Sequence, residues 1–168
     1  DQLERMEAEI EGLKAIIGDL IYSYEDDNLE NCIGKLLKSH NKTLSTAESC
    51  TGGLVASMLT SVPGSSEYFL GSVVSYANSV KHGVLGVSEE ILKEHGAVSG
   101  ECVSAMADGV RKLTGSDFSV ATSGIAGPGG GSDEKPVGSV WIAVSSQKGT
   151  ETFRLLFNSD RKRNTERF

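Results

Sequence analysis

Short β-prone segments alternate with helical segments through the first two-thirds of this chain, and two further β-prone segments then follow in succession. This order predicts an α/β fold: a three-layer α/β/α sandwich with a mostly parallel mixed sheet and an antiparallel edge hairpin. The expected strands are 43–47, 69–76, 118–121, 137–145 and 151–157. The expected helices follow Asn28, cover 52–59 and 78–85, and begin at Ser88 and at Ser99 or Gly100.

Length and charge exclude several classes of protein. The 168 residues fit one domain with an appendage, and a chain of this length needs no disulfide or metal to hold its core. The net charge of −7 and the lack of a long basic run argue against binding to duplex nucleic acid. No apolar run approaches the length of a membrane span. The three scattered cysteines are typical of reduced thiols, so we expect a cytoplasmic protein.

The first segment, residues 2–20, has the pattern of an amphipathic helix. Its apolar residues recur at alternating spacings of three and four, and are Leu3, Met6, Ile10, Leu13, Ile17 and Leu20. The stripe spans fewer than three heptads, which is short for a free-standing coiled coil. It fits a helix packed on its own domain, a connector from a preceding domain, or a helix lying on a second subunit. A polar turn is expected at 23–28, where Asn28 caps the next helix.

Three loops should meet at the carboxyl ends of the parallel strands, where ligands collect in sheets of this kind. They are residues 48–53, 76–82 and 123–136. We therefore expect the chemistry of the protein in these three loops.

The first loop contains Ser49 between a strand and a helix. Its hydroxyl fits two roles, a cap of the helix or a nucleophile at a sharp turn, although the flanking residues do not form a GxSxG motif. A nucleophile needs a base, and none of the three histidines has an obvious Asp partner. Lysine can serve if burial lowers its pKa. Lys81 and Tyr76, in the second loop, can point into one crevice, or Lys81 can lie exposed on a short helix.

The third loop, residues 123–131, carries four glycines within five residues after a strand. It matches neither the GxGxxG nor the Walker A motif. Such a loop allows a ligand to approach the backbone closely, or it is a mobile surface loop. No cluster of His, Cys and carboxylate residues has the spacing of metal ligands, so we expect neither a metal nor a cofactor.

Taken together, these stretches resemble the C-terminal domain family of CinA proteins, the nicotinamide-nucleotide amidohydrolases. The resemblance covers roughly residues 29–160 and rests on 47–53, 71–81, 123–130 and 135–138. It implies a Ser-Lys amidase that converts nicotinamide mononucleotide to nicotinate mononucleotide and ammonia. Two departures stand out: Ser123 occupies a position where members often carry Thr, and the final helix of the family is expected to be missing.

The resemblance implies roles for individual residues. Ser49 matches the nucleophile, and Lys81 and Tyr76 match the basic and proton-handling positions. The N–H groups of residues 50–52 would hold the developing oxyanion. The residues expected to bind substrate are Glu48, Cys50, Thr51, Gly52, Gly53, Ser123, Gly124, Gly127, Gly129 and Gly130.

The organisation and the partners follow from the same reasoning. We expect a connector helix and turn over 1–28 and an amidohydrolase domain over 29–168. The expected partner is a small nucleotide substrate, with no nucleic acid and no membrane. A homo-oligomer and a preceding domain in a longer chain fit the connector helix. A regulatory module that binds a nucleotide without catalysis would use the same glycines and would need neither Ser49 nor Lys81.

Overall fold

The computed structural model describes residues 1–23 and 27–168, so part of the predicted polar turn lies outside the described residues. Five strands form one sheet: β1 (Leu44–Glu48), β2 (Phe69–Val74), β3 (Phe118–Gly124), β4 (Ser139–Ser146) and β5 (Gly149–Leu156). The α-helices are α1 (Gln2–Ile17), α2 (Leu29–Ser39), α3 (Leu54–Thr60), α4 (Asn78–Gly83), α5 (Glu89–Glu94), α6 (Gly100–Thr114) and α7 (Arg161–Arg167). Two short 3-10 helices, η1 (Gly18–Leu20) and η2 (Ser65–Glu67), complete the elements.

The sheet has the order β2-β1-β3-β4-β5. β1 pairs in parallel with β2 and β3, whereas β4 runs antiparallel to both β3 and β5. Four strands therefore point one way and only β4 is reversed. The predicted mixed sheet with an antiparallel edge hairpin is confirmed.

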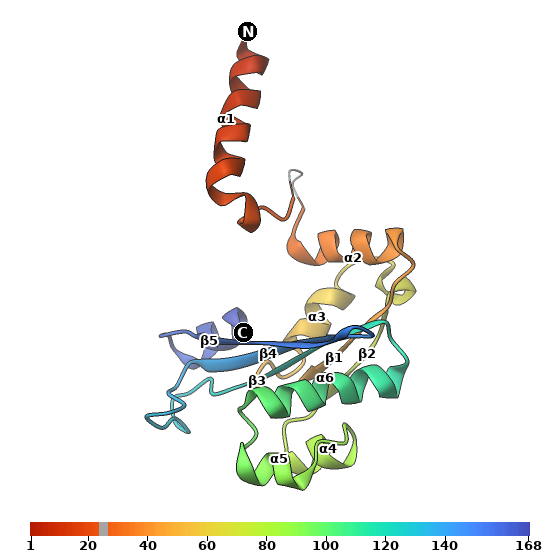
Figure 1. Cartoon of the computed structure of the whole chain (residues 1–168), viewed down its shortest axis with the longest axis vertical. Coiled ribbons are helices and arrows are strands. Elements are labelled where there is room, and N and C mark those ends of the chain that lie inside the picture. The colour runs from red at the N-terminus through yellow and green to blue at the C-terminus, as the bar shows by residue number, and fades with distance from the viewer. Residues whose placement is uncertain (24–26) are drawn as a thin grey trace.

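Helices cover both faces of the sheet (Figure 1). α6 crosses one face with α4 and α5 beyond it, and α3 and α2 lie on the other. The main core lies under α6, where Ala47, Ala121 and Ala143 stand in register on three adjacent strands and are fully buried. These small side chains let α6 approach the sheet closely. Its apolar face fills the space with Val103, Met106 and Val110, all fully buried.

The predicted helix starts are largely right. Asn28, Ser88 and Ser99 each cap the following helix through a side-chain oxygen that accepts a backbone N–H. The helix predicted over 52–59 begins later, at Leu54, because Gly53 adopts a left-handed conformation with φ 102°. The sequence analysis did not predict α7, which Asp160 caps in the same way.

The N-terminal helix α1 forms as expected but does not pack into the core of the domain. None of its side chains is buried, and Figure 1 shows it standing clear of the sheet. The alternative that this helix packs on its own domain is therefore wrong. In the part of the chain that the structure describes, no helix combines the length and apolar character needed to cross a membrane.

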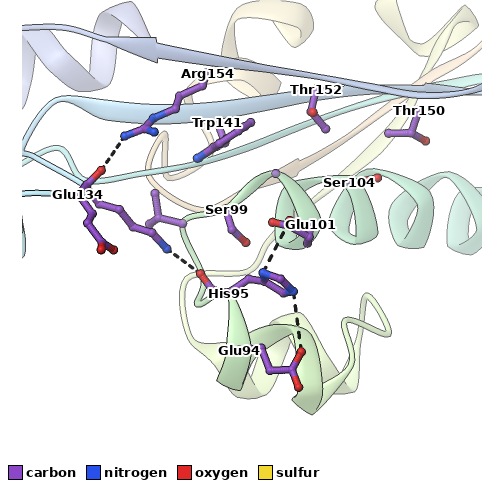
Figure 2. A pocket seen from close by; sticks show the side chains of 13 residues that line it. Glu94, His95, Ser99, Glu101, Ser104, Glu134, Trp141, Thr150, Thr152 and Arg154 are labelled. Carbon is purple, nitrogen blue, oxygen red and sulfur yellow. Dashed lines mark hydrogen bonds and ion pairs between the residues drawn. The ribbon is translucent and has the colours of Figure 1, made fainter.

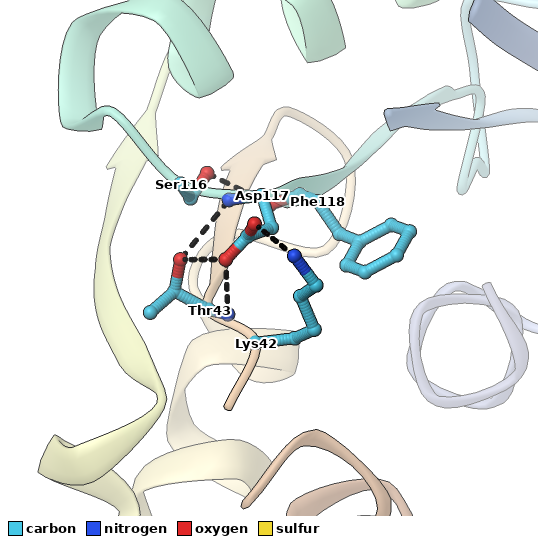
Figure 3. Close-up of polar contacts among 5 residues, drawn as sticks. All are labelled: Lys42, Thr43, Ser116, Asp117 and Phe118. Atoms are coloured by element: carbon cyan, nitrogen blue, oxygen red, sulfur yellow. Dashed lines mark hydrogen bonds and ion pairs between the residues drawn. The ribbon is translucent and has the colours of Figure 1, made fainter. Parts of the chain in front are cut away.

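A carboxylate connects the amino ends of β1 and β3, at the opposite end of these strands from the predicted loops (Figure 3). Asp117 accepts hydrogen bonds from the Lys42 ammonium and from the backbone N–H and hydroxyl of Thr43, at 2.8–2.9 Å. These donors lower the pKa of Asp117 to about 2. The contact fixes the parallel register of the two strands that carry Ser49 and the glycine-rich loop at their other ends.

Candidate active site

Ser49 lies on the sharp turn that follows β1. Its N–H donates to the carbonyl oxygen of Thr122 at 3.0 Å, which extends the pairing of β1 with β3 by one residue. Its own carbonyl oxygen accepts from Gly52 N–H at 3.2 Å, and Gly52 and Gly53 both have positive φ. The chain therefore reverses immediately after Ser49. Ser49 does not cap α3, because Gly53 occupies the N-cap position.

Glu48, and not Ser49, binds the free N–H groups at the start of α3. Its carboxylate is fully buried and accepts four hydrogen bonds. Three come from the backbone N–H groups of Gly53, Val55 and Ala56, and one from the Thr51 hydroxyl, at 2.7–3.1 Å. A negative side chain at a helix N-terminus is favoured both by the free N–H groups and by the helix dipole. Glu48 thus fixes the turn that holds Ser49 and does not reach the pocket.

Lys81, on the first turns of α4, is buried with 1% of its surface exposed. Its ammonium nitrogen lies 3.0 Å from Ser49 Oγ, 2.6 Å from the carbonyl oxygen of Ser75 and 3.4 Å from that of Tyr76. The two carbonyl oxygens can only accept, so each fixes one N–H of the lysine. When the amine is neutral, its lone pair is left to face the serine hydroxyl. The alternative of an exposed lysine is therefore wrong.

Burial acts differently on the two reactive groups beside Ser49. It lowers the pKa of Lys81 from its ordinary value, because the charged form loses its hydration. It raises the pKa of the Cys50 thiol to about 12, for the same reason applied to a thiolate. At neutral pH the thiol is protonated and weakly nucleophilic. The arrangement therefore favours Ser49 as the nucleophile and Lys81 as its base.

Arg161, at the start of α7, brings a positive charge to the site and was missed by the sequence analysis. Its guanidinium donates to the Gly127 carbonyl oxygen at 2.6 Å and to the Tyr76 hydroxyl at 3.0 Å. Asn164, fully buried one turn later, donates to the Ala126 carbonyl oxygen at 3.1 Å. These bonds anchor α7 against the glycine-rich loop. The acidic N-cap Asp160 was a usable signal for a helix start, although it did not place Arg161 in the pocket.

Tyr76 contributes to the site through two different atoms. Its carbonyl oxygen contacts Lys81, whereas its hydroxyl is held by Arg161 and its side chain is 64% exposed. The phenol therefore has no hydrogen bond with Ser49 or Lys81 among the described residues. It faces the outer part of the pocket and not the reacting pair.

These residues line a pocket of about 270 Å³ at the carboxyl ends of β1, β2 and β3. All three predicted loops contribute to it, together with 97–98 and α7, which the sequence did not indicate. The lining residues are Ser49, Cys50, Tyr76, Asn78, Lys81, Ala97, Val98, Gly124, Ile125, Ala126, Gly127, Gly129, Gly130 and Arg161. None of the three histidines is among them.

Several residues predicted to bind substrate are not among those that line this pocket. They are Glu48, Thr51, Gly52, Gly53 and Ser123. The Thr51 hydroxyl bonds to Glu48 and to Thr122. The Ser123 hydroxyl donates to the Ala97 carbonyl oxygen at 2.7 Å, which fixes the segment that forms one wall. The hydroxyls of Thr51 and Ser123 therefore support the walls of the site.

The turn also supplies candidate donors for an oxyanion. Gly52 N–H is already bonded to Ser49, and Gly53 N–H to Glu48. The N–H groups of Cys50 and Thr51 have no backbone or side-chain oxygen acceptor among the described residues. Cys50 and Thr51 directly follow the nucleophile. Of the three predicted oxyanion donors, Gly52 N–H is therefore excluded, and those of Cys50 and Thr51 remain.

A larger and more open pocket of about 650 Å³ adjoins the first and shares Val98 with it. It lies between the start of α6, the end of α5 and the outer strands (Figure 2). There Arg154 donates to the Glu134 carbonyl oxygen at 2.7 Å and Lys135 to that of His95 at 2.6 Å. It carries charges of both signs, and no hydrogen bond joins one of its bases to one of its hydroxyls among the described residues. The smaller pocket is therefore the better candidate for chemistry.

Among the described residues, no group of three or more His, Cys, Asp or Glu could hold a metal ion.

The fold and the site together define the class of this protein. It is an α/β/α sandwich with a buried Ser-Lys pair, a candidate nucleophilic site, at the carboxyl ends of its parallel strands. Residues 26–168 match the family model of the CinA C-terminal domain. The chain therefore belongs to the CinA family, and the resemblance inferred from the three sequence motifs is confirmed.

Relatives of known sequence and structure agree with this assignment. The chain is 50% identical over 144 residues to a CinA-like protein of Thermotoga maritima, and 46% identical over 168 residues to one of Cytophaga hutchinsonii. These matches cover 86% and 98% of this chain but only 35% and 40% of the relatives. The crystal structure of the competence/damage inducible protein CihA from Agrobacterium tumefaciens superposes with a TM-score of 0.80 at 40% identity, over 82% of this chain and 84% of that one.

We predict that Glu48→Gln lowers the free energy of unfolding by about 1–3 kcal/mol, because an amide turns an N–H₂ group toward at least one of the four donors. Urea unfolding measures this loss. Glu67→Gln, an exposed carboxylate paired with Lys38, is the matched control and should change stability by less than about 0.5 kcal/mol. Amide hydrogen exchange at Gly53, Val55 and Ala56 should accelerate only in Glu48→Gln. Equal stability of the two variants would contradict the capping role.

Proposed function

We propose that this domain hydrolyses the carboxamide of nicotinamide mononucleotide to nicotinate mononucleotide and ammonia, through an acyl-enzyme on Ser49. The observation that carries the proposal is the 3.0 Å contact between the buried Lys81 nitrogen and Ser49 Oγ. The CinA family assignment, made from the sequence motifs, supplies the substrate class. Such a reaction serves the recycling of pyridine nucleotides.

The proton of Ser49 has one acceptor at hand. Neutral Lys81, with two N–H groups held by the Ser75 and Tyr76 carbonyl oxygens, takes the proton as Oγ bonds to the carboxamide carbon. The resulting ammonium then gives this proton to the leaving nitrogen, and the C–N bond breaks to release ammonia. Water next attacks the ester and loses a proton to Lys81. The proton returns to Ser49 Oγ as the C–O bond breaks, and the carboxylic acid that forms releases its own proton to solvent and leaves as a carboxylate.

The developing oxyanion lies next to Ser49 in this scheme. The N–H groups of Cys50 and Thr51 are positioned by the turn that Glu48 holds, so they need no rearrangement when charge develops. This role matches the N–H donors expected from the sequence, except for Gly52, whose N–H is bonded within the turn.

The phosphate of the substrate is assigned to the outer part of the pocket. Arg161 places a guanidinium there, beside the glycines of residues 127–130, in a protein whose net charge would otherwise repel an anion. Tyr76 holds that guanidinium through its hydroxyl, so we assign it to substrate positioning and not to proton transfer. Binding energy from the phosphate would place the carboxamide over Ser49.

Substitutions of the reacting pair test the proposed chemistry by ammonia release from nicotinamide mononucleotide. Ser49→Ala should lower kcat by at least about 10³-fold, and Lys81→Met by about 10²–10⁴-fold. Lys81→Arg should not restore activity, because a guanidinium stays protonated. Cys50→Ala, one residue along, is the control and should retain activity within about tenfold. Loss of activity in Cys50→Ala with retention in Ser49→Ala would indicate a cysteine mechanism.

The assigned phosphate contact predicts a ranking of substrates. We expect kcat/KM to fall by about 10–100-fold from nicotinamide mononucleotide to nicotinamide riboside, and further for nicotinamide. Arg161→Gln should lower kcat/KM for the nucleotide by a similar factor and leave the riboside unchanged. Arg163→Gln, a largely exposed arginine on the same helix, is the matched control. Equal values for all three compounds would contradict the phosphate site, and tight nucleotide binding without ammonia release would favour the non-catalytic regulatory module.

A further inference from the structure

One polar side chain that lines the candidate active site has no hydrogen-bond partner. Six of the lining side chains can form hydrogen bonds, and they belong to Ser49, Cys50, Tyr76, Asn78, Lys81 and Arg161. The two reacting groups bond to each other, the Tyr76 hydroxyl is held by Arg161, and a thiol is only a weak donor. Among the described residues, nothing bonds to the side-chain oxygen or the N–H₂ group of Asn78. Both groups are therefore available to a ligand.

The fold itself makes no use of the Asn78 side chain. Asn78 is the first residue of α4, and Ala77 before it is the N-cap, where no side-chain hydrogen bond forms. An asparagine near a helix start commonly bonds to neighbouring backbone groups. The side chain of Asn78 bonds to no described backbone group, so substituting it should leave the stability of the domain nearly unchanged.

The helix places Asn78 beside the proposed base. Residues three apart on an α-helix share a face, with about 5–6 Å between their Cβ atoms, so Asn78 and Lys81 project from the same side of α4. Both line the pocket, where the Lys81 nitrogen contacts Ser49 Oγ at 3.0 Å. The free amide of Asn78 thus lies on the same side of the pocket as the group that protonates the leaving nitrogen in the proposed reaction.

A bound carboxamide presents two unlike ends to this pocket. Its oxygen only accepts hydrogen bonds, and it meets the N–H donors that follow Ser49. Its nitrogen carries two N–H groups and needs acceptors. The backbone carbonyl oxygens of Ala97, Ala126 and Gly127 already accept hydrogen bonds from side chains. The side-chain oxygen of Asn78 accepts from no described donor, so it fits the nitrogen end of the carboxamide.

We propose that the side-chain oxygen of Asn78 accepts a hydrogen bond from the N–H₂ group of the substrate carboxamide and turns its nitrogen toward Lys81. Without this contact the planar carboxamide can bind in the reversed orientation, with its oxygen at the base and its nitrogen at the oxyanion donors, where no reaction follows. Asn78 thus positions the substrate and selects a leaving group that donates a hydrogen bond. This role rests on the proposed amidase function and adds to it the residue that orients the leaving group.

Two substrates that differ only in the leaving group test this contact. Nicotinamide mononucleotide carries an N–H₂ group, whereas the methyl ester of nicotinate mononucleotide has no N–H there and shares the ribose and phosphate. Asn78→Ala should lower the ratio of kcat/KM for the amide to kcat/KM for the ester by about 10–100-fold, because a hydrogen bond to the reacting group is lost. Release of ammonia and of methanol measures the two reactions. Ser79→Ala, at the next residue and outside the pocket lining, is the matched control and should leave the ratio unchanged.

Binding measurements in a Ser49→Ala background, where no acyl-enzyme forms, separate this contact from the reaction itself. Calorimetry should show that Asn78→Ala weakens binding of nicotinamide mononucleotide several-fold relative to the methyl ester. Circular dichroism of each variant checks that the domain remains folded.

The outcomes distinguish failure of this contact from failure of the amidase function. An equal loss on amide and ester would overturn the contact, because Asn78 would then bind the ribose or phosphate that both compounds share. No loss on either compound would overturn it as well, and ammonia release by the unaltered chain would still support the amidase. A chain that binds the amide through Asn78 but releases no ammonia would overturn the amidase function alone. A chain that binds neither compound would overturn both.

Discussion

The buried nitrogen of Lys81 is the interaction on which the site depends. It joins three elements at one point: the turn after β1 through Ser49, the end of β2 through the carbonyl oxygens of Ser75 and Tyr76, and α4, which carries the lysine itself. No described carboxylate forms an ion pair with it. Burial in such surroundings lowers the pKa of the lysine, because the charged form loses its hydration. The fold thereby creates a base next to a hydroxyl that needs one.

The neighbouring buried carboxylate, Glu48, differs from Lys81 in its hydrogen-bond partners. Glu48 is as deeply buried as Lys81, yet four donors converge on it, and its burial is compensated by hydrogen bonds. It stabilises the turn and the start of α3, and this turn orients Ser49 and the N–H groups of Cys50 and Thr51, which have no oxygen acceptor among the described residues. Both buried groups are adjacent to Ser49. Glu48 positions the serine, and Lys81 is placed to accept its proton. The Asp117 contact at the far end of β1 and β3 holds the register on which both rely.

Much of the fold could be predicted from the sequence because each element has a local signal. Alternating apolar strands, side-chain caps at Asn28, Ser88 and Ser99, and loops after parallel strands together placed the sheet and the position of the site. The predicted end of β3 and the predicted start of α3 are both too early, because pairing across the sheet extends the strand and two glycines delay the helix. Neither effect is visible in local propensity.

The composition of the pocket was harder to predict than its location. Ser49 and Lys81 were chosen as candidates, but only the three-dimensional structure distinguishes a buried lysine from an exposed one. Glu48 and Ser123 were expected to bind substrate, whereas their side chains form hydrogen bonds with backbone groups nearby. Arg161 comes from a helix more than 80 residues beyond Tyr76 in the chain, and no local pattern links the two.

The ionisation of Lys81 is the measurement that tests the central claim most directly. The protein labelled with carbon-13 at the lysine side chains can be titrated by NMR, with the Lys81→Met spectrum assigning the resonance. We predict that Lys81 loses its proton below the ordinary lysine pKa of 10.5, because burial disfavours its charged form. A neutral amine would then be available to Ser49 nearer to physiological pH. A Lys81 resonance that titrates at or above 10.5 would contradict the account, because the lysine would be a fixed positive charge and not a base.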